Sequence, residues 1–326
     1  MKKVTIHISK IVASVLAVLF LTSAVYYNVN ITGQEINPNV HFSQGVEYVN
    51  KGMFDEAIAE FDKVLKINPR DALAYYNRAL AYQNKGQYKQ AIADYNKAIE
   101  INPGDADAYN NRGNIYRTEG SYDKAIADYN KALEINPMLA ETYNNRGNIY
   151  AHKGLYDEAI SDYNNALKVN SRYAVDYYNR GNAYRGKGHY DKAIADYNKA
   201  LEINPRFTEA YVNRGITYYD QGRYDQAISD FNKALEINPR FAPAYHNRGV
   251  VYQSKGQYGR AISDYNKAIE INPRDAKTYY SKAYACEKTN NIKEATEAYK
   301  AFLRYAPPQY AQNIEYARER IKKLEN

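Results

Sequence analysis

The sequence predicts an all-α fold in which pairs of short antiparallel helices stack as a solenoid. The first observation is a period of 34 residues, in which prolines and alanines recur in one phase. The second is the spacing of apolar residues within each period, three and four apart, as on one face of a helix. The third is composition, because 37 of the 326 residues are tyrosine, 8 are phenylalanine and none is tryptophan. So strong a skew indicates a repeated segment.

Eight units of 34 residues run from Pro38 to Gln309 and define the expected domain organisation. The units are 38–71, 72–105, 106–139, 140–173, 174–207, 208–241, 242–275 and 276–309. The prolines that mark them are Pro69, Pro103, Pro137, Pro205, Pro239, Pro273 and Pro307, with Ser171 standing in one place. Because 37 residues remain before the units and 17 after them, we expect no separate catalytic domain.

Each unit is expected to form two helices joined by a turn. In 106–139, apolar or small residues occupy positions 4, 8 and 11, and then positions 17, 20, 21, 24, 27 and 28. Gly120, at position 15, separates the two runs. Asn136 and Pro137 end the second run, because a residue before proline disfavours the helical conformation. Each helix then has about 14 residues and a length of roughly 21 Å.

Small residues at positions 8 and 20 indicate where the two helices of a unit approach each other. Position 8 is glycine or alanine, and position 20 is alanine. The tyrosines at positions 4 and 11 and the aromatic residue at position 24 are expected to fill the space to the next unit. A larger side chain at Ala125 or Ala193 should therefore destabilise the fold by about 1–3 kcal/mol.

The repeat resembles the tetratricopeptide repeat. The period, the small residues at positions 8 and 20, the aromatic residues at positions 4, 11, 17 and 24, and the proline near the end of the unit all match that family. The resemblance covers about five-sixths of the chain. It implies a right-handed superhelical α-solenoid of helix-turn-helix repeats, whose first helices line a concave groove that binds a protein or peptide.

Arginine at position 7 and aspartate at position 23 occur together in six repeats and are both absent from the first and last repeats. We therefore expect each arginine to fork onto an aspartate of a nearby second helix, as a structural contact. An acidic peptide that competes for the arginine row is the alternative. The residues assigned to this structural role include Arg112, Asp128, Arg180 and Asp196.

An asparagine row at position 6 is the main candidate for ligand binding. It resembles the asparagine ladder of the O-linked N-acetylglucosamine transferase superhelix, which implies that its amides face the groove and hold a peptide backbone. An amide offers both a donor and an acceptor, so it pairs with any peptide unit. The alternative is that these amides cap or bridge neighbouring helices. The candidates are Asn77, Asn111, Asn145, Asn179, Asn213 and Asn247, with Asn114, Asn148 and Asn182 at position 9.

Other groove positions differ between repeats, which is where specificity would arise. The groove is polar in repeats three to five and more apolar in repeats six to eight, although unselected drift in a repeat array would produce the same variation. Position 5 has no lysine, so a carboxylate clamp of the chaperone-binding type is not expected. The tyrosines expected to face the groove are Tyr76, Tyr178, Tyr219, Tyr280 and Tyr284.

The two ends of the chain differ from the repeats. In residues 1–27, three lysines precede an apolar run, which is typical of an export signal or of an uncleaved membrane anchor. Both interpretations place the repeats outside the cytoplasm, and residues 28–37 are a linker. Residues 310–326 form an amphipathic pattern that predicts a capping helix, with a membrane-surface or partner-binding helix as the alternative.

No enzymatic, metal or nucleic-acid motif is evident. The five histidines lack metal-ligand spacing, and Cys286 takes the place of a packing tyrosine, so we expect no cofactor and no metal. Three of the lysines behind the net charge of +7 lie in the first 24 residues, and the rest are interspersed with carboxylates, so nucleic-acid binding is not expected.

The sequence therefore predicts a non-catalytic protein-binding scaffold that holds an extended peptide or a partner helix in its concave groove. We expect it to be exported or anchored in the inner membrane, within the periplasm or cell envelope. A purely structural or self-associating solenoid is one alternative. An accessory subunit of an envelope enzyme or secretion complex is another. A membrane tether through residues 1–27 and a homo-oligomer both remain open, as does the identity of the ligand.

Overall fold

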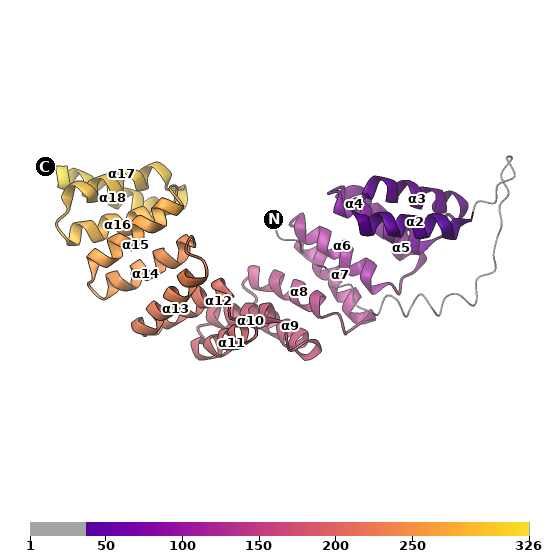
Figure 1. Cartoon of the computed structure of the whole chain (residues 1–326), viewed down its shortest axis with the longest axis horizontal. Coiled ribbons are helices and arrows are strands. Elements are labelled where there is room, and N and C mark those ends of the chain that lie inside the picture. The colour runs from indigo at the N-terminus through magenta and orange to yellow at the C-terminus, as the bar shows by residue number, and fades with distance from the viewer. Residues whose placement is uncertain (1–36, 326) are drawn as a thin grey trace. The chain divides into compact units, whose positions relative to one another are not determined.

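The computed structural model describes residues 37–325, and this part of the chain is helical throughout, without a strand (Figure 1). The predicted all-α fold is thereby confirmed. The chain divides into two compact units, Met1–Ile115 and Tyr116–Asn326, which we call unit 1 and unit 2. The division falls within helix α6 (Ala106–Thr118), in the third repeat. The predicted signal or anchor and most of the predicted linker lie outside the described residues.

Unit 1 contains two helical hairpins and the larger part of α6. Its helices are α2 (Pro38–Lys51), α3 (Phe54–Ile67), α4 (Ala72–Asn84) and α5 (Tyr88–Ile101). Each pair is a first and a second helix of one repeat, as the spacing predicts.

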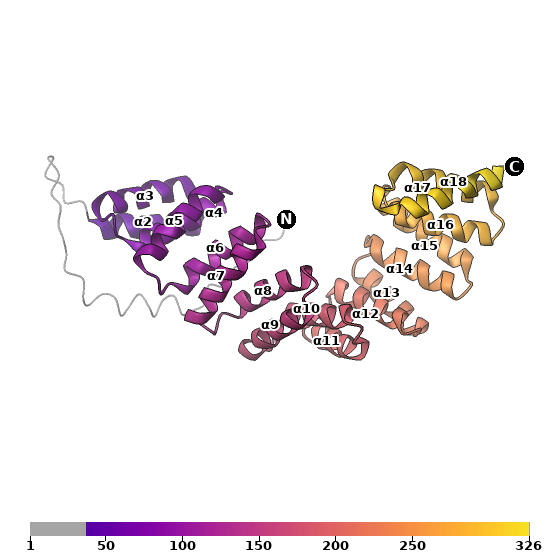
Figure 2. The ribbon, with the colours of Figure 1, turned by 180° about the vertical axis from the view of Figure 1, so that it is seen from behind.

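Unit 2 continues the same pattern through five further hairpins, which can be followed from both sides (Figures 1 and 2). Each first helix packs on its own second helix and on the second helix of the preceding repeat. Its helices are α7 (Tyr122–Ile135), α8 (Ala140–His152), α9 (Tyr156–Val169), α10 (Ala174–Gly186), α11 (Tyr190–Ile203), α12 (Thr208–Asp220), α13 (Tyr224–Ile237), α14 (Ala242–Ser254), α15 (Tyr258–Ile271), α16 (Ala276–Lys288), α17 (Ile292–Tyr305), the short 3-10 helix η2 (Pro308–Tyr310) and α18 (Ala311–Glu325).

The glycine at position 15 ends the first helix of the first seven repeats in a left-handed conformation. Gly188, between α10 and α11, has a φ of 74°, and its equivalents in the other repeats have nearly the same value. An L-residue rarely adopts this conformation, whereas glycine does so without steric cost. In the last repeat Asn290 takes the place of this glycine with a φ of 55°, which asparagine tolerates better than most residues.

The core of each repeat is an aromatic ring packed against the backbone of the first helix. The Tyr197 ring is fully buried, as is Ala193 one turn earlier in α11. A Cβ atom added to Gly181 would lie 2.9 Å from the Tyr197 ring and 3.3 Å from the carbonyl oxygen of Ala193. The small residues at positions 8 and 20 thus allow the close approach of the two helices.

Replacing Ala193 by leucine is expected to lower the free energy of unfolding by about 1–3 kcal/mol, because the site has no space for extra methylene groups. Urea denaturation followed by far-UV circular dichroism measures this change. The matched control is Ala195→Leu, the same substitution on an exposed position of the same helix. Equal stability of the two variants would show that the contact at position 20 is loose.

Helix α18 covers the end of unit 2. It packs on α17, and its Ala317 is fully buried in a cluster with Ile314, Ile321 and Leu324. Arg320 forks onto Glu287 of α16, with Nε to Oε1 at 3.1 Å and Nη2 to Oε2 at 2.7 Å. The predicted capping helix is thereby confirmed, because α18 buries the apolar face of the last repeat against its own.

An arginine ladder connects repeats four to seven, each with its predecessor. Arg180 of α10 donates from Nε and Nη2 to both carboxylate oxygens of Asp196 in α11, at 2.8 and 2.6 Å. Its Nη1 donates to Asn164 Oδ1 of the preceding repeat at 2.6 Å, a contact that we did not predict. The guanidinium also lies 5.4 Å from the ring centroid of Tyr177. The same three hydrogen bonds recur at Arg146, Arg214 and Arg248.

Arg112 and Asp128, the other predicted pair, belong to different units, so their pairing stays a prediction. Arg112 donates from Nη1 to Asn96 Oδ1 at 2.6 Å within unit 1. Asp128 is buried in α7 of unit 2.

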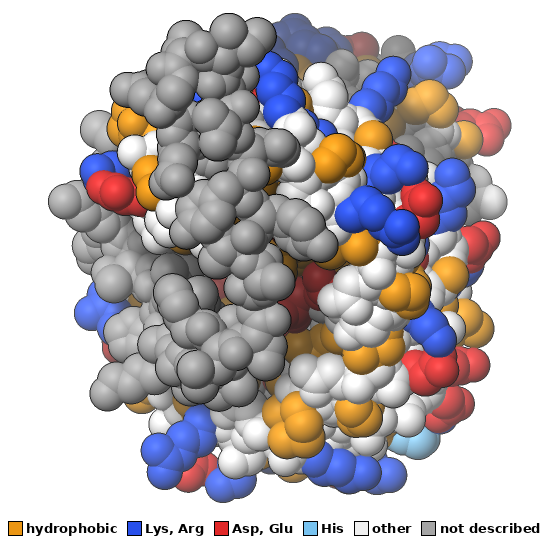
Figure 3. Space-filling view, turned by 90° about the vertical axis from the view of Figure 1, so that its right-hand side faces the viewer, with side chains coloured by type: hydrophobic (Ala, Val, Ile, Leu, Met, Phe, Trp, Pro, Cys, Tyr) orange, Lys and Arg blue, Asp and Glu red, His pale blue; other side chains and the backbone are white. Residues whose placement is uncertain are grey.

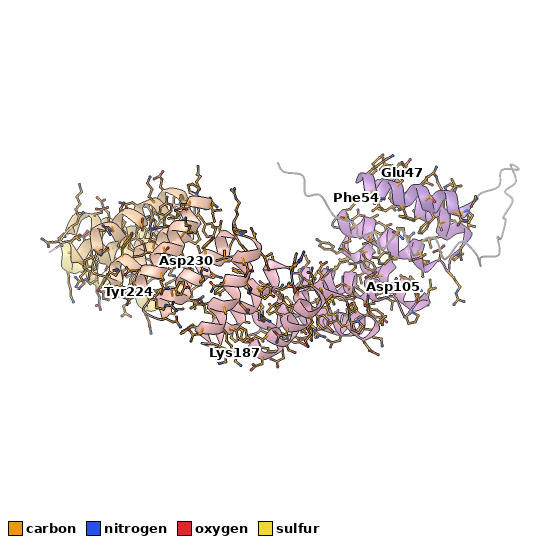
Figure 4. All side chains as sticks on the ribbon, turned by 60° about the horizontal axis from the view of Figure 1, so that its bottom comes forward. Glu47, Phe54, Asp105, Lys187, Tyr224 and Asp230 are labelled. Atoms are coloured by element: carbon orange, nitrogen blue, oxygen red, sulfur yellow. The ribbon has the colours of Figure 1, made fainter. Side chains whose placement is uncertain are left out.

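A second ladder of ion pairs follows the edge at which the hairpins turn. Lys153 Nζ lies 2.7 Å from Asp123 Oδ1, and Lys187 pairs with Asp157 in the same way one repeat later. Lys187 lies at this edge, whereas Asp230 lies among the helices (Figure 4). On the face that Figure 3 shows, Lys and Arg are likewise mixed with Asp and Glu. None of the described helices is long and apolar enough to cross a membrane.

Candidate functional site

The first helices of unit 2 form the candidate surface. Helices α8, α10, α12, α14 and α16 contact one another in sequence. Their position 6 carries the asparagine row as far as α14, and their positions 5, 9 and 12 differ between repeats. We call the surface formed by these four positions the first-helix face. The hydrogen bonds that these positions make within and between repeats determine which side chains are held in place and which are available to a ligand.

Two asparagines of the position-6 row are bound to a tyrosine of the preceding repeat. Asn213 Nδ2 donates to the Tyr178 hydroxyl at 2.9 Å and to Asn182 Oδ1 at 2.8 Å. In unit 1, Asn111 Nδ2 donates to the Tyr76 hydroxyl at 3.0 Å. Burial raises the pKa of Tyr76 and Tyr178, so both phenols stay neutral. Asn111 and Asn213 therefore bridge neighbouring repeats, which is the structural alternative for this row.

The other members of the row have different surroundings. Asn77 and Asn247 each donate to a carbonyl oxygen of their own helix, Leu73 and Pro243, both at 2.8 Å. The Asn179 side chain makes no hydrogen bond to any described residue, and it is partly exposed. Asn145 is buried in α8.

Two asparagines at position 9 accept hydrogen bonds from buried tyrosines of the core. The hydroxyls of Tyr163 and Tyr197 donate to Asn148 Oδ1 and Asn182 Oδ1, each at 2.7 Å. In two other repeats a glutamine at position 12 accepts instead, as Gln83 does from Tyr95 at 2.9 Å. Where the core ring is Phe231, position 9 is apolar. Asn114, at the unit boundary, is partly exposed, and its role stays a prediction. The polar zone of repeats four and five thus has a packing reason, because a buried hydroxyl requires an acceptor.

Position 5 contacts position 3 of the next repeat, a pairing that sequence reasoning missed. Asn144 Nδ2 donates to Asp176 Oδ1, and both side chains are buried. His246 Nδ1 lies 2.8 Å from Thr278 Oγ1. Where position 5 is Tyr or Val, position 3 of the next repeat is alanine, as in Tyr178 and Ala210. A polar residue at position 3, following a polar residue at position 5 of the preceding repeat, was the feature of the sequence that could have indicated this pairing.

Two buried groups of this pairing have strongly shifted pKa values. Burial raises the pKa of Asp176 to about 6, and the hydrogen bond from Asn144 offsets only part of the shift. Burial lowers the pKa of His246 to about 4, assisted by the charge of Lys277 and opposed by that of Asp275. His246 Nε2 is buried without a hydrogen-bond partner among the described residues.

The three tyrosines of the later repeats have different surroundings. The Tyr219 hydroxyl lies 3.1 Å from Ser254 Oγ, and its ring centroid lies 5.8 Å from that of Tyr224. Tyr280 packs on Phe302 and on Tyr316 of α18, so it belongs to the cap. Tyr284 lies under Lys288, with Nζ 5.3 Å from the ring centroid. Tyr219 thus contacts the next repeat, whereas Tyr284 contacts its own helix, and both side chains are partly exposed.

A shallow cleft of about 320 Å³ lies where repeats four to six turn. Its lining includes the rings of Tyr156 and Tyr190 and an ion pair of Arg185 Nε with Asp220 Oδ2 at 3.1 Å. Gly186 lies beneath the Tyr156 ring, which a Cβ atom would meet at 2.6 Å.

The described residues contain no cluster of histidine, cysteine and carboxylate side chains that would hold a metal ion. Cys286 is buried, and burial raises its pKa to about 11, so the thiolate that a nucleophile requires is scarce.

Comparisons with known proteins identify the repeat. Residues 45–86, 113–154 and 181–222 match a family model described as TPR repeat, and residues 72–105, 140–173, 208–241 and 242–275 match one described as tetratricopeptide repeat. A further tetratricopeptide model matches residues 94–127 and 264–297. Together the matches cover residues 45–173 and 181–297. No curated protein matches the chain.

Solved structures are similar over large parts of the chain. The C-terminal part of a TPR repeat-containing protein from Cytophaga hutchinsonii is 19% identical, with a TM-score of 0.61 over 74% of this chain and 98% of that one. A tetratricopeptide repeat protein from Parabacteroides merdae is 22% identical, with a TM-score of 0.56 over 76% and 98%. YrrB, described as a TPR protein with an unusual peptide-binding site, is 31% identical, with a TM-score of 0.49 over 58% and 97%.

Proposed function

Because the chain belongs to the tetratricopeptide repeat family, we propose that it is a non-catalytic scaffold that holds an extended peptide on the first-helix face of unit 2. Scaffolds of this family are suited to protein–protein interaction. In this chain, amides of the first-helix face would hold the backbone of the partner.

The observation that carries the proposal is the difference among the position-6 asparagines. Asn213 is held by two hydrogen bonds to the preceding repeat, whereas Asn179 makes none to a described residue. Asn247 donates to its own helix, and its Oδ1 accepts no hydrogen bond from the described part of the chain. Asn179 and Asn247 therefore have amide groups available, which pair with a peptide backbone whatever its side chains. Tyr219 and Tyr284 are the partly exposed rings of the same face on which an apolar side chain of the peptide would pack.

Changing Asn179 and Asn247 together to alanine is expected to weaken peptide binding about tenfold, because each backbone hydrogen bond contributes about 0.5–1.5 kcal/mol. A peptide selected from a random library on the purified chain is the probe, and fluorescence anisotropy gives its dissociation constant. The melting temperature should not change, because neither amide bridges two repeats.

Two control variants separate binding from folding. Asn165→Ala, on the second helix α9, removes only a contact of 3.4 Å with Lys168 and should leave affinity unchanged. Asn213→Ala removes the bonds to Tyr178 and Asn182 and should lower stability. Wild-type affinity in the double variant, together with peptide crosslinks on the second helices, would rule out the first-helix face and leave the purely structural solenoid as the better interpretation.

We also propose that the scaffold acts in the cell envelope, exported or tethered by residues 1–27. The support is the lysine-flanked apolar run of that segment. Fractionation of cells that express the full chain tests this, and recovery of all the protein from the cytoplasm would refute it.

A further inference from the structure

A continuous line of hydrogen bonds runs from the core tyrosine of repeat four, through positions 9 and 5 of the first-helix face, to repeat five. The Tyr163 hydroxyl of α9 donates to Asn148 Oδ1 at 2.7 Å, and Asn148 Nδ2 donates to Asn144 Oδ1 at 2.9 Å. Asn144 Nδ2 then donates to Asp176 Oδ1 of α10. Every donor in this line points toward the carboxylate, so the line has a direction that the ionised form of Asp176 sets.

Asp176 is 1% exposed, and no Lys, Arg or His of the described residues forms an ion pair with it. From α8 it faces the neutral Asn144, and from α9 it faces Tyr163, whose pKa its charge helps to raise. In α11, Asp196 is paired with Arg180. In α12, the charge of Glu209 acts on Tyr178. By contrast, the buried aspartates at position 23 of repeats four to seven, such as Asp162, each pair with an arginine.

We propose that Asp176 is a proton-controlled switch that reverses this line of hydrogen bonds and thereby changes the polarity of the first-helix face between repeats four and five. A carboxylate only accepts hydrogen bonds, whereas a carboxylic acid also donates one. On gaining a proton from solvent, Asp176 donates to Asn144, which turns its amide to present Oδ1.

The reversal passes along the line because each amide has one acceptor and one donor side. Once Asn144 turns, its Nδ2 faces Asn148, and Asn148 turns so that its own Oδ1 accepts. Asn148 Nδ2 then faces the Tyr163 oxygen, which becomes the acceptor, while the Tyr163 hydroxyl gives up the acceptor that Asn148 Oδ1 supplied. Asn148 is partly exposed at position 9, so the proton on Asp176 alters which group the surface offers to a ligand.

The position of Asp176 in the repeat supports a dedicated role. Position 3 is alanine or threonine in the other repeats from the second to the eighth. Because the pKa of Asp176 is raised to about 6, protonation begins as the pH falls below neutrality, which is the interval in which a switch would respond.

The test uses NMR to measure the side-chain amide signals of Asn144 and Asn148, and it needs no ligand. The full chain labelled with ¹⁵N-asparagine is titrated from pH 7.5 to 4.5, and the Asn144 and Asn148 side-chain signals are assigned by Asn144→Ser and Asn148→Ser. We expect both signals to shift with one midpoint near pH 6, and the shifts to vanish in Asp176→Asn. The control Asp220→Asn changes an exposed acid and should leave them intact. The proposal would be overturned if the amide signals did not shift as the pH falls, or if they shifted equally in Asp176→Asn.

A second measurement relates the switch to binding and rests on the proposed function. The affinity of the selected peptide is compared at pH 7.5 and pH 5.0, with a change of about fivefold expected from one altered hydrogen bond, and no change expected in Asp176→Asn. If the amides titrate while no peptide binds the first-helix face, the proposed function fails and the switch stands. If a peptide binds there and the amides do not titrate, the switch fails alone.

Discussion

Replacing Arg180 by alanine is expected to lower the free energy of unfolding of unit 2 by about 3 kcal/mol. The change leaves Asp196 buried without its guanidinium and removes the hydrogen bond to Asn164. Breaking a buried ion pair from one side costs more than the pair contributes, because the remaining charge is already desolvated. Urea denaturation of the full chain, followed by circular dichroism, measures the loss.

A double-mutant cycle separates the pair from its surroundings. Arg180→Ala, Asp196→Ala and the double variant should give a coupling energy of about 1.5–3 kcal/mol, because the second change removes the stranded charge. Lys199→Ala is the control, since Lys199 forms only an exposed pair with Glu202 and should cost less than about 1 kcal/mol. A cost below about 1 kcal/mol for Arg180→Ala would mean that the ladder contributes little to stability.

Acid is expected to destabilise unit 2 through His246, by up to about 3 kcal/mol between pH 6.5 and pH 4. Its pKa is lowered from about 6.5 to about 4 because the ring is buried, so the folded chain favours the neutral form. The resulting stability is fully present above pH 6.5 and is lost as the pH falls through 4. His246→Gln keeps a partner for Thr278 and removes the titration.

The measurement is the difference in free energy of unfolding between wild type and His246→Gln at pH 7, 6, 5 and 4. Wild type should lose stability relative to the variant as the pH falls. Asp176 acts with the opposite sign, because the stabilisation from its raised pKa is lost as the pH rises toward 6, and it cancels in the difference. The exposed His189→Gln is the control. A difference that does not change with pH would show that His246 is not buried in the neutral form.

The repeat fold could be predicted from the sequence because residues of the same type recur at the same positions in the eight repeats. Residues such as Gly181, Ala193 and Tyr197 were expected to pack together, since their equivalents recur every 34 residues. The prediction of the capping helix rested on apolar spacing after Pro308, and α18 covers the last repeat in that way.

The candidate site was harder to predict, because the same residue type serves two purposes within one row. Asn179 and Asn213 are equivalent in the repeat, yet only Asn213 is held by the preceding repeat. The difference arises from position 5 of the repeat before, which is Tyr178 for Asn213 and Asn144 for Asn179. A pattern within one repeat cannot show this, because the contact joins two repeats.

The sequence by itself determined the helices, their pairing and the small and aromatic residues of the core, since these depend on local spacing and on a motif repeated eight times. Only the tertiary structure decided which polar groups are satisfied. Asn148 and Asn182 proved to be acceptors for buried tyrosines, and Asp176 proved to be buried without a cation from the described residues. The physical reason is that burial and hydrogen bonding depend on what the neighbouring repeat places opposite each side chain, and this is set by packing in three dimensions.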